Sequence, residues 1–112
     1  MAKLFNRVRV ETTTTGSGDI SLGATVAGFQ NFANGGVADG DEVSYVIEDG
    51  ASYEIGRGIY SDANTTLTRN VIESSNSDNA LNLTGSAEVF LSVNNKDIYT
   101  QSQIIGITIA LG

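Results

Sequence analysis

The chain has 112 residues, 40% of them hydrophobic, and a formal net charge of −7 from 13 acidic and six basic residues. It contains no His and no Cys, which excludes imidazole bases, Ser-His-Asp triads, thiol nucleophiles and disulfides. An acidic surface repels phosphate backbones, so nucleic acid is not an expected partner. The chain contains no run of about 18 apolar residues, so no membrane span is predicted.

The first predicted element is a half-buried β-strand. In residues 7–15 (RVRVETTTT), polar and apolar side chains alternate with a period of two, which places Val8, Val10 and Thr12 on one face. The sequence GSGD at 16–19 then predicts a turn, followed by a strand short enough to be an edge or a hairpin return.

An irregular loop is expected next. Residues 23–36 carry two phenylalanines three positions apart, Phe29 and Phe32, a spacing that would also fit one turn of helix. Glycines stand too close on both sides for a helix. We therefore predict a loop that places both rings in the core.

The middle of the chain predicts a three-stranded antiparallel meander. Residues 39–50 alternate regularly and end in Asp49–Gly50, a favoured two-residue hairpin turn. The return strand lies in 51–61, and a third strand follows in 65–75. Within the return strand, the glycines of Gly56-Arg57-Gly58 indicate a bulge or the close approach of another backbone. The arginine between them could pair with a carboxylate or face a neighbouring subunit.

The last third of the chain predicts a short strand or loop at 80–83, a strand at 86–93, and an apolar tail at 103–112. No charged residue follows Asp97. The tail is either a central core strand or a strand that pairs with another copy, because an unpaired apolar edge promotes aggregation. Alternation places these tail residues on one face: Ile105, Ile107, Ile109 and Leu111.

These elements predict an all-β protein with no helix. Seven or eight short strands at roughly ten-residue spacing are typical of an antiparallel β-sandwich or small barrel. We expect a single β-domain over residues 1–112. Residues 1–6 would form an N-terminal arm, and 98–112 a C-terminal apolar strand segment.

No catalytic site is expected. Without His or Cys, acid–base chemistry would fall to carboxylates, and Glu48 and Glu54 could face each other across the hairpin as a glycosidase pair would. Carboxylates beside a tight turn are, however, normally exposed to water. We therefore predict that the chain is not an enzyme.

No metal or cofactor is expected either. The segments ADGDE and SSNSDN carry oxygen ligands, but neither follows the spacing of a calcium loop. The GRG stretch lacks the helix start and the GK[ST] sequence of a phosphate-binding loop. Surface turns of an acidic protein explain the first two segments, and a bulge or the close approach of another backbone explains the third.

A family resemblance rests on five features: a threonine-run strand, a G-F-Q-x-F loop, an aromatic-rich D-G hairpin, a T-L-x-R strand and an S-S-N turn. Together they cover residues 7 to 91, about three quarters of the chain. In this order they resemble a β-rich module of structural proteins in tailed-bacteriophage virions, often fibre-like ones. This chain differs in ending soon after the module, with no long fibre region.

The resemblance implies a virion structural protein, assembled in the bacterial host cytoplasm. Small size favours a capsid decoration (cement) protein or head-attached subunit, as a homotrimer bound to the major capsid protein or another virion protein. The alternative is a tail-fibre or baseplate component for host adsorption. Carbohydrate would then bind exposed tyrosines such as Tyr53, Tyr60 and Tyr99, although packing in the core or an interface also explains these residues.

Partner contacts are predicted at the two termini. The N-terminus combines apolar side chains with basic ones that could dock on an acidic neighbour, although a solvated strand end explains the basic residues too. The C-terminal segment supplies apolar side chains. The predicted partner-binding residues are Leu4, Phe5, Arg7, Arg9, Ile105, Ile107 and Ile109.

Overall fold

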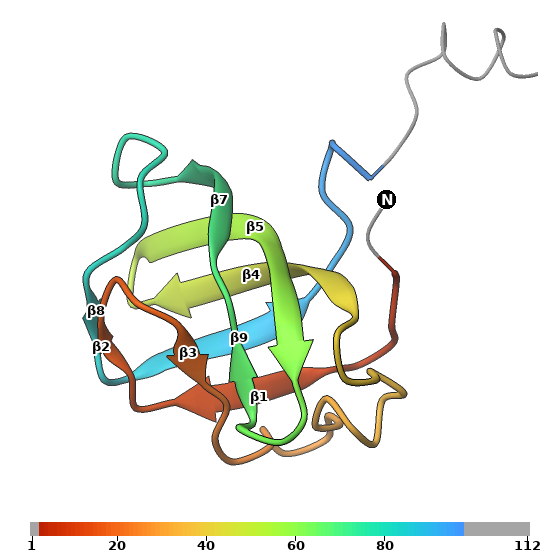
Figure 1. Ribbon diagram of the computed structural model, residues 1–112. Coiled ribbons are helices and arrows are strands. Elements are labelled where there is room, and N and C mark those ends of the chain that lie inside the picture. Colours follow the sequence, from red (N-terminus) through yellow and green to blue (C-terminus); the bar gives the residue numbers. More distant parts are fainter. Residues whose placement is uncertain (1–2, 98–112) are drawn as a thin grey trace, which may run out of the picture.

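A computed structural model describes residues 3–97 and confirms the all-β class (Figure 1). These residues form nine strands rather than seven or eight, because four of the nine are pairings of only two residues. They form no helix, and so none long and apolar enough to cross a membrane. The strands are β1 (Arg9–Thr12), β2 (Thr15–Gly16), β3 (Ile20–Ser21), β4 (Glu42–Asp49), β5 (Ser52–Ser61), β6 (Thr66–Leu67), β7 (Asn70–Ser74), β8 (Leu83–Thr84) and β9 (Ala87–Leu91).

One curled antiparallel sheet holds seven of the strands. Its order is β1-β9-β4-β5-β6-β3, with β7 also paired to β5, while β2 and β8 form a separate two-stranded sheet. The predicted meander is present, since β5 pairs with β4 on one side and with β6 and β7 on the other. Strand β9 lies between β1 and β4 and pairs with both, so it connects the first strand of the chain to the central hairpin.

The curled sheet returns to its first strand. Beyond β3, the Gly23 amide donates a 2.8 Å hydrogen bond to the Glu11 carbonyl, and the Glu11 amide donates one of 2.8 Å to the Ala24 carbonyl. The segment that follows β3 therefore covers the open edge of β1. This closure protects backbone groups that would otherwise offer a pairing edge to another chain.

The β4–β5 hairpin turns one residue later than the sequence predicted. Asp49 pairs with Ser52, so the two loop residues are Gly50 and Ala51, and Gly50 adopts a positive φ of 62°. Asp49 stays in the strand because its carboxylate accepts hydrogen bonds of 2.9 and 2.8 Å from the amide and hydroxyl of Thr84. The acidic residue therefore connects β4 to β8 instead of forming the turn.

The core lies inside the curled sheet. Val8, Val10 and Thr12 are buried together, which confirms the face predicted from their alternation. The Phe32 ring stacks on the Tyr60 ring with centroids 5.3 Å apart. The prediction that the irregular loop places Phe32 in the core is thus confirmed, and the segment around it contains no helix.

The two glycines of the GRG stretch allow close contact between strands, as the sequence indicated. The register between β5 and β7 shifts between Ile55 and Gly56. A side chain at Gly56 would collide with the backbone carbonyl of Asn70, and one at Gly58 with that of Thr68. Glycine is required at both positions because the neighbouring backbone occupies the space of a Cβ atom.

Candidate functional site

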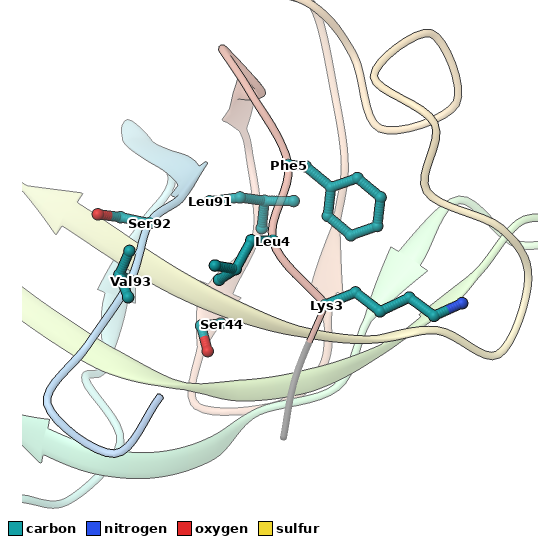
Figure 2. Close-up of a pocket in the computed structure, with 7 residues that line it drawn as sticks. All are labelled: Lys3, Leu4, Phe5, Ser44, Leu91, Ser92 and Val93. Carbon is teal, nitrogen blue, oxygen red and sulfur yellow. The ribbon is translucent and has the colours of Figure 1, made fainter. Parts of the chain in front are cut away.

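An apolar cleft of about 210 Å³ lies where the N-terminal arm meets the chain after β9 (Figure 2). The arm forms one wall. The Lys3 amide donates a 3.0 Å hydrogen bond to the Glu42 carbonyl, which holds the arm beside β4. The chain after β9 forms the other wall. We call this feature the terminal cleft. Its lining residues are Lys3, Leu4, Phe5, Ser44, Leu91, Ser92 and Val93.

Two apolar side chains of the terminal cleft are open to water. Leu4 is 56% exposed and Val93 is 45% exposed. In Figure 2 the Leu4 side chain points toward Leu91 and Val93. Phe5 is half-buried and packs against the core. Of the two apolar residues predicted in the arm, Leu4 is therefore available to a partner, and Phe5 mainly fixes the arm to the domain.

Arg7 and Arg9 are engaged within the subunit. The Arg7 guanidinium lies 4.1 Å from the centre of the Phe29 ring, and that of Arg9 lies 4.6 Å from the centre of the Phe90 ring. Arg9 also forms a 2.6 Å ion pair with Glu88. The prediction that Phe29 enters the core is wrong, because the ring stacks with these arginines and stays half-buried. Docking by Arg7 or Arg9 on a partner remains a prediction.

The C-terminal end of the described chain is anchored to the outer face of β5. Arg57 donates hydrogen bonds of 2.9 Å to the Asp97 carboxylate and 2.8 Å to the Lys96 carbonyl. Of the two possibilities for this arginine, pairing with a carboxylate is the one observed. Outside the described residues lie segment 98–112, Tyr99 and the predicted partner-binding residues Ile105, Ile107 and Ile109.

The possible glycosidase pair is not brought together. Ile47 pairs directly with Glu54 across the hairpin, so Glu54 shares the inward face of Ile47, whereas Glu48 points outward toward Arg9. The expectation that carboxylates beside this turn are solvated is wrong for Glu54, which is 0% exposed. Within the described residues, no group of three or more acidic side chains is placed to hold a metal ion.

Glu54 and Arg69 form a buried ion pair inside the domain. Their side chains are 0% and 2% exposed. The two Glu54 oxygens accept hydrogen bonds from the Nε and Nη2 atoms of Arg69, from the Tyr45 hydroxyl at 2.7 Å and from the Leu81 amide at 2.9 Å. This carboxylate is therefore fully coordinated and has no access to a substrate.

All five N–H donors of Arg69 are used as well. Besides the two bonds to Glu54, Nη1 donates to the carbonyls of Gly16 and Gly18 at 3.3 and 3.1 Å, and Nη2 donates to that of Leu81 at 2.9 Å. The pair connects β5, the chain before β7, the turn between β2 and β3, and the loop before β8. With Tyr45 of β4, which donates to Glu54, it holds five segments together.

The sequence contained one signal for this buried carboxylate. In a hairpin with a two-residue loop, even-numbered residues of the return strand share a face with odd-numbered residues of the first strand. Glu54 therefore lies on the same face as the apolar residues Val43, Tyr45 and Ile47. Such a placement requires a buried cation, and Arg69 is in phase with Leu67 on the next predicted strand.

The ion pair makes stability dependent on pH. Burial alone would raise the pKa of Glu54, but hydrogen bonds from Arg69, Tyr45 and Leu81 outweigh it and hold that pKa below its ordinary value of 4.5. The folded state therefore binds this proton more weakly than the unfolded state does. The stabilisation by this carboxylate is complete when the pH is above the ordinary pKa. It is lost as the pH falls through the pKa of the folded state.

We expect this loss in urea unfolding measured from about pH 7 to about pH 2. The free energy of unfolding of the wild type should fall more steeply in the acid range than that of the Glu54→Gln variant, which has no proton to bind at this site. The other carboxylates are common to both proteins and cancel in the comparison. Parallel acid slopes would contradict the assignment.

The tyrosines considered for carbohydrate binding differ in accessibility. Tyr53 is 37% exposed, and its hydroxyl donates a 3.2 Å hydrogen bond to Glu73. Tyr60 is 3% exposed, because one face of its ring stacks on Phe32. Among the described tyrosines considered for this role, only Tyr53 has a ring surface open to a sugar.

A scan against protein-family models found no match, and searches of curated proteins and of solved structures found none either. The candidate site therefore rests on the geometry of the described residues. That geometry offers an apolar cleft beside the N-terminal arm, and the buried Glu54 carboxylate is fully hydrogen-bonded by its own chain.

Proposed function

We propose that the chain is a structural subunit of a bacteriophage virion. It acts as a capsid decoration protein that stabilises the particle through contacts between copies and with the major capsid protein. The observation that carries the proposal is the terminal cleft, where Leu4 and Val93 expose apolar surface beside the end of the described chain. Exposed apolar surface of this kind is typical of a contact with another protein.

Three further features support this role. The carboxylate best shielded from water is coordinated by Arg69, Tyr45 and Leu81, so it serves the stability of the domain. The closed sheet leaves few pairing edges, which suits a subunit whose contacts are made by its terminal segments. The phage-like order of motifs over residues 7 to 91 indicates the kind of particle.

Imaging of the virion tests the proposal. Particles assembled with and without this chain are compared by electron microscopy, and we expect the difference density to lie at regular positions on the capsid surface. Particles that lack the chain should also lose their DNA at a lower temperature. Difference density confined to the tail tip would overturn the decoration role and support the alternative role in host adsorption.

A further inference from the structure

The outer face of the sheet carries half-buried apolar residues, of which Phe90 is partly covered by the Arg9 guanidinium. Val46 pairs directly with Ile55 on one side and with Phe90 on the other, which forms a row across β5, β4 and β9. All three side chains are half-buried. We call this row the outer strip. It leads toward the terminal cleft, because Ser44 on the same face of β4 lines that cleft.

The described part of the chain exposes few large apolar side chains to a second copy. The large apolar side chains exposed in the described part are Leu4, Tyr53, Ile59 and Val93. A stable protein–protein interface buries about 1,200–2,000 Å². The sequence beyond Asp97 offers further apolar side chains in Ile105, Ile107 and Ile109.

Charge favours the same segment. Each copy has a formal net charge of −7, so two acidic domains repel each other as they approach. No charged residue follows Asp97, so residues 98–112 can approach a neighbouring copy without that cost. The segment begins on the same face of the sheet as the terminal cleft. Arg57 holds Asp97 against the outer side of β5. On β4, the residue directly opposite Arg57 is Ser44, which lines the cleft.

We propose that residues 105–111 of one copy dock, in extended form, in the terminal cleft and along the outer strip of a second copy. The inference rests on the proposed multimeric subunit and names the surface through which the copies associate. Alternation places Ile105, Ile107 and Ile109 on one face of the docked strand, which packs on Val93 and on the outer strip. The occupant is a second copy because the proposed subunit is multimeric, and this uncharged segment can approach an acidic neighbour without charge repulsion.

Cysteine cross-linking tests the docking directly, because the chain has no cysteine of its own. Val93→Cys and Ile107→Cys proteins are prepared separately, mixed in equal amounts, left to exchange subunits and oxidised mildly. We expect a disulfide-linked product of twice the chain mass that contains both variants. A Gly18→Cys protein mixed with Ile107→Cys is the matched control, since Gly18 is exposed and has open space around it.

A second measurement follows association of the unmodified full-length chain. Sedimentation should give a multimer of the wild type, and Leu4→Glu should raise its dissociation constant at least tenfold. Leu4 is 56% exposed, so the fold tolerates this change. Glu11→Gln, which also alters an exposed side chain by one charge, should leave the dissociation constant within about twofold.

The outcomes separate this inference from the proposed function. A single chain that carries both Val93→Cys and Ile107→Cys can also be oxidised at high dilution. If a cross-link forms there and not between mixed single variants, the segment covers its own domain, which overturns docking between copies. A wild-type multimer without any Val93–Ile107 cross-link would overturn the docking position but leave the multimeric subunit intact. A monomer at all concentrations would contradict the proposed multimer itself.

Discussion

Replacing Arg69 with methionine is expected to lower the free energy of unfolding by about 3–5 kcal/mol, the usual effect of removing one partner from a buried ion pair. The Glu54 carboxylate would remain at 0% exposure without its cation. The carbonyls of Gly16, Gly18 and Leu81 would each lose a donor as well. Because a domain of this size is stabilised by only about 5–15 kcal/mol, this one change removes a large share.

Urea unfolding at neutral pH measures this effect, and Arg9→Met provides the matched control. Arg9 also forms ion pairs with two glutamates, but its side chain is 21% exposed and solvent weakens both pairs. We expect that control to lose about 1 kcal/mol. Adding Glu54→Gln to Arg69→Met should restore part of the loss, because no buried charge then remains. A loss for Arg69→Met no larger than that for Arg9→Met would contradict the assigned role of the pair.

Replacing Gly56 with alanine is expected to destabilise the domain by about 1–3 kcal/mol, the typical cost of overpacking a core. The new Cβ atom would lie 2.6 Å from the Tyr45 hydroxyl oxygen and would collide with the Asn70 carbonyl. Either β7 must move away from β5, or the Tyr45 ring must shift. A shift of the ring would lengthen its 2.7 Å hydrogen bond to Glu54.

Thermal and urea unfolding of Gly56→Ala should be compared with those of Gly18→Ala. Gly18 has nothing within 4 Å of the position of an added Cβ and no positive φ, so alanine is accommodated there. The control should be as stable as the wild type or slightly more stable, because alanine reduces the freedom of the unfolded chain. Equal stability of the two variants would show that β5 and β7 separate without cost.

The strands that depend on local patterns could be predicted from the sequence. Alternation identified the buried face of β1, and the meander around β4 and β5 follows from three alternating runs joined by turn residues. The turn itself lies one residue later than predicted, because Asp49 bonds to Thr84, a residue 35 positions away. Local turn preferences cannot register a contact made so far along the chain.

Long-range placement escaped prediction for the same physical reason. Alternation predicts a strand in residues 86–93, where β9 lies, but it does not predict that β9 lies between β1 and β4. A partner contact through the predicted residues stays a prediction. Leu4 and Phe5 both line the terminal cleft, but Phe5 is also half-buried against the core, and Arg7 stacks on Phe29. Stacking of a cation on an aromatic ring does not follow the alternation of polar and apolar residues, so it could not be predicted from that pattern.

The bonds of Arg69 also bear on how long the folded state lasts. They join residues separated by 12 to 53 positions, including Gly16, Glu54 and Leu81, so several loops must close before all of them can form. Contacts that form after the transition state slow unfolding more than they speed folding. Slow unfolding is therefore expected for this domain, and it would suit the proposed role in a particle that persists outside a host.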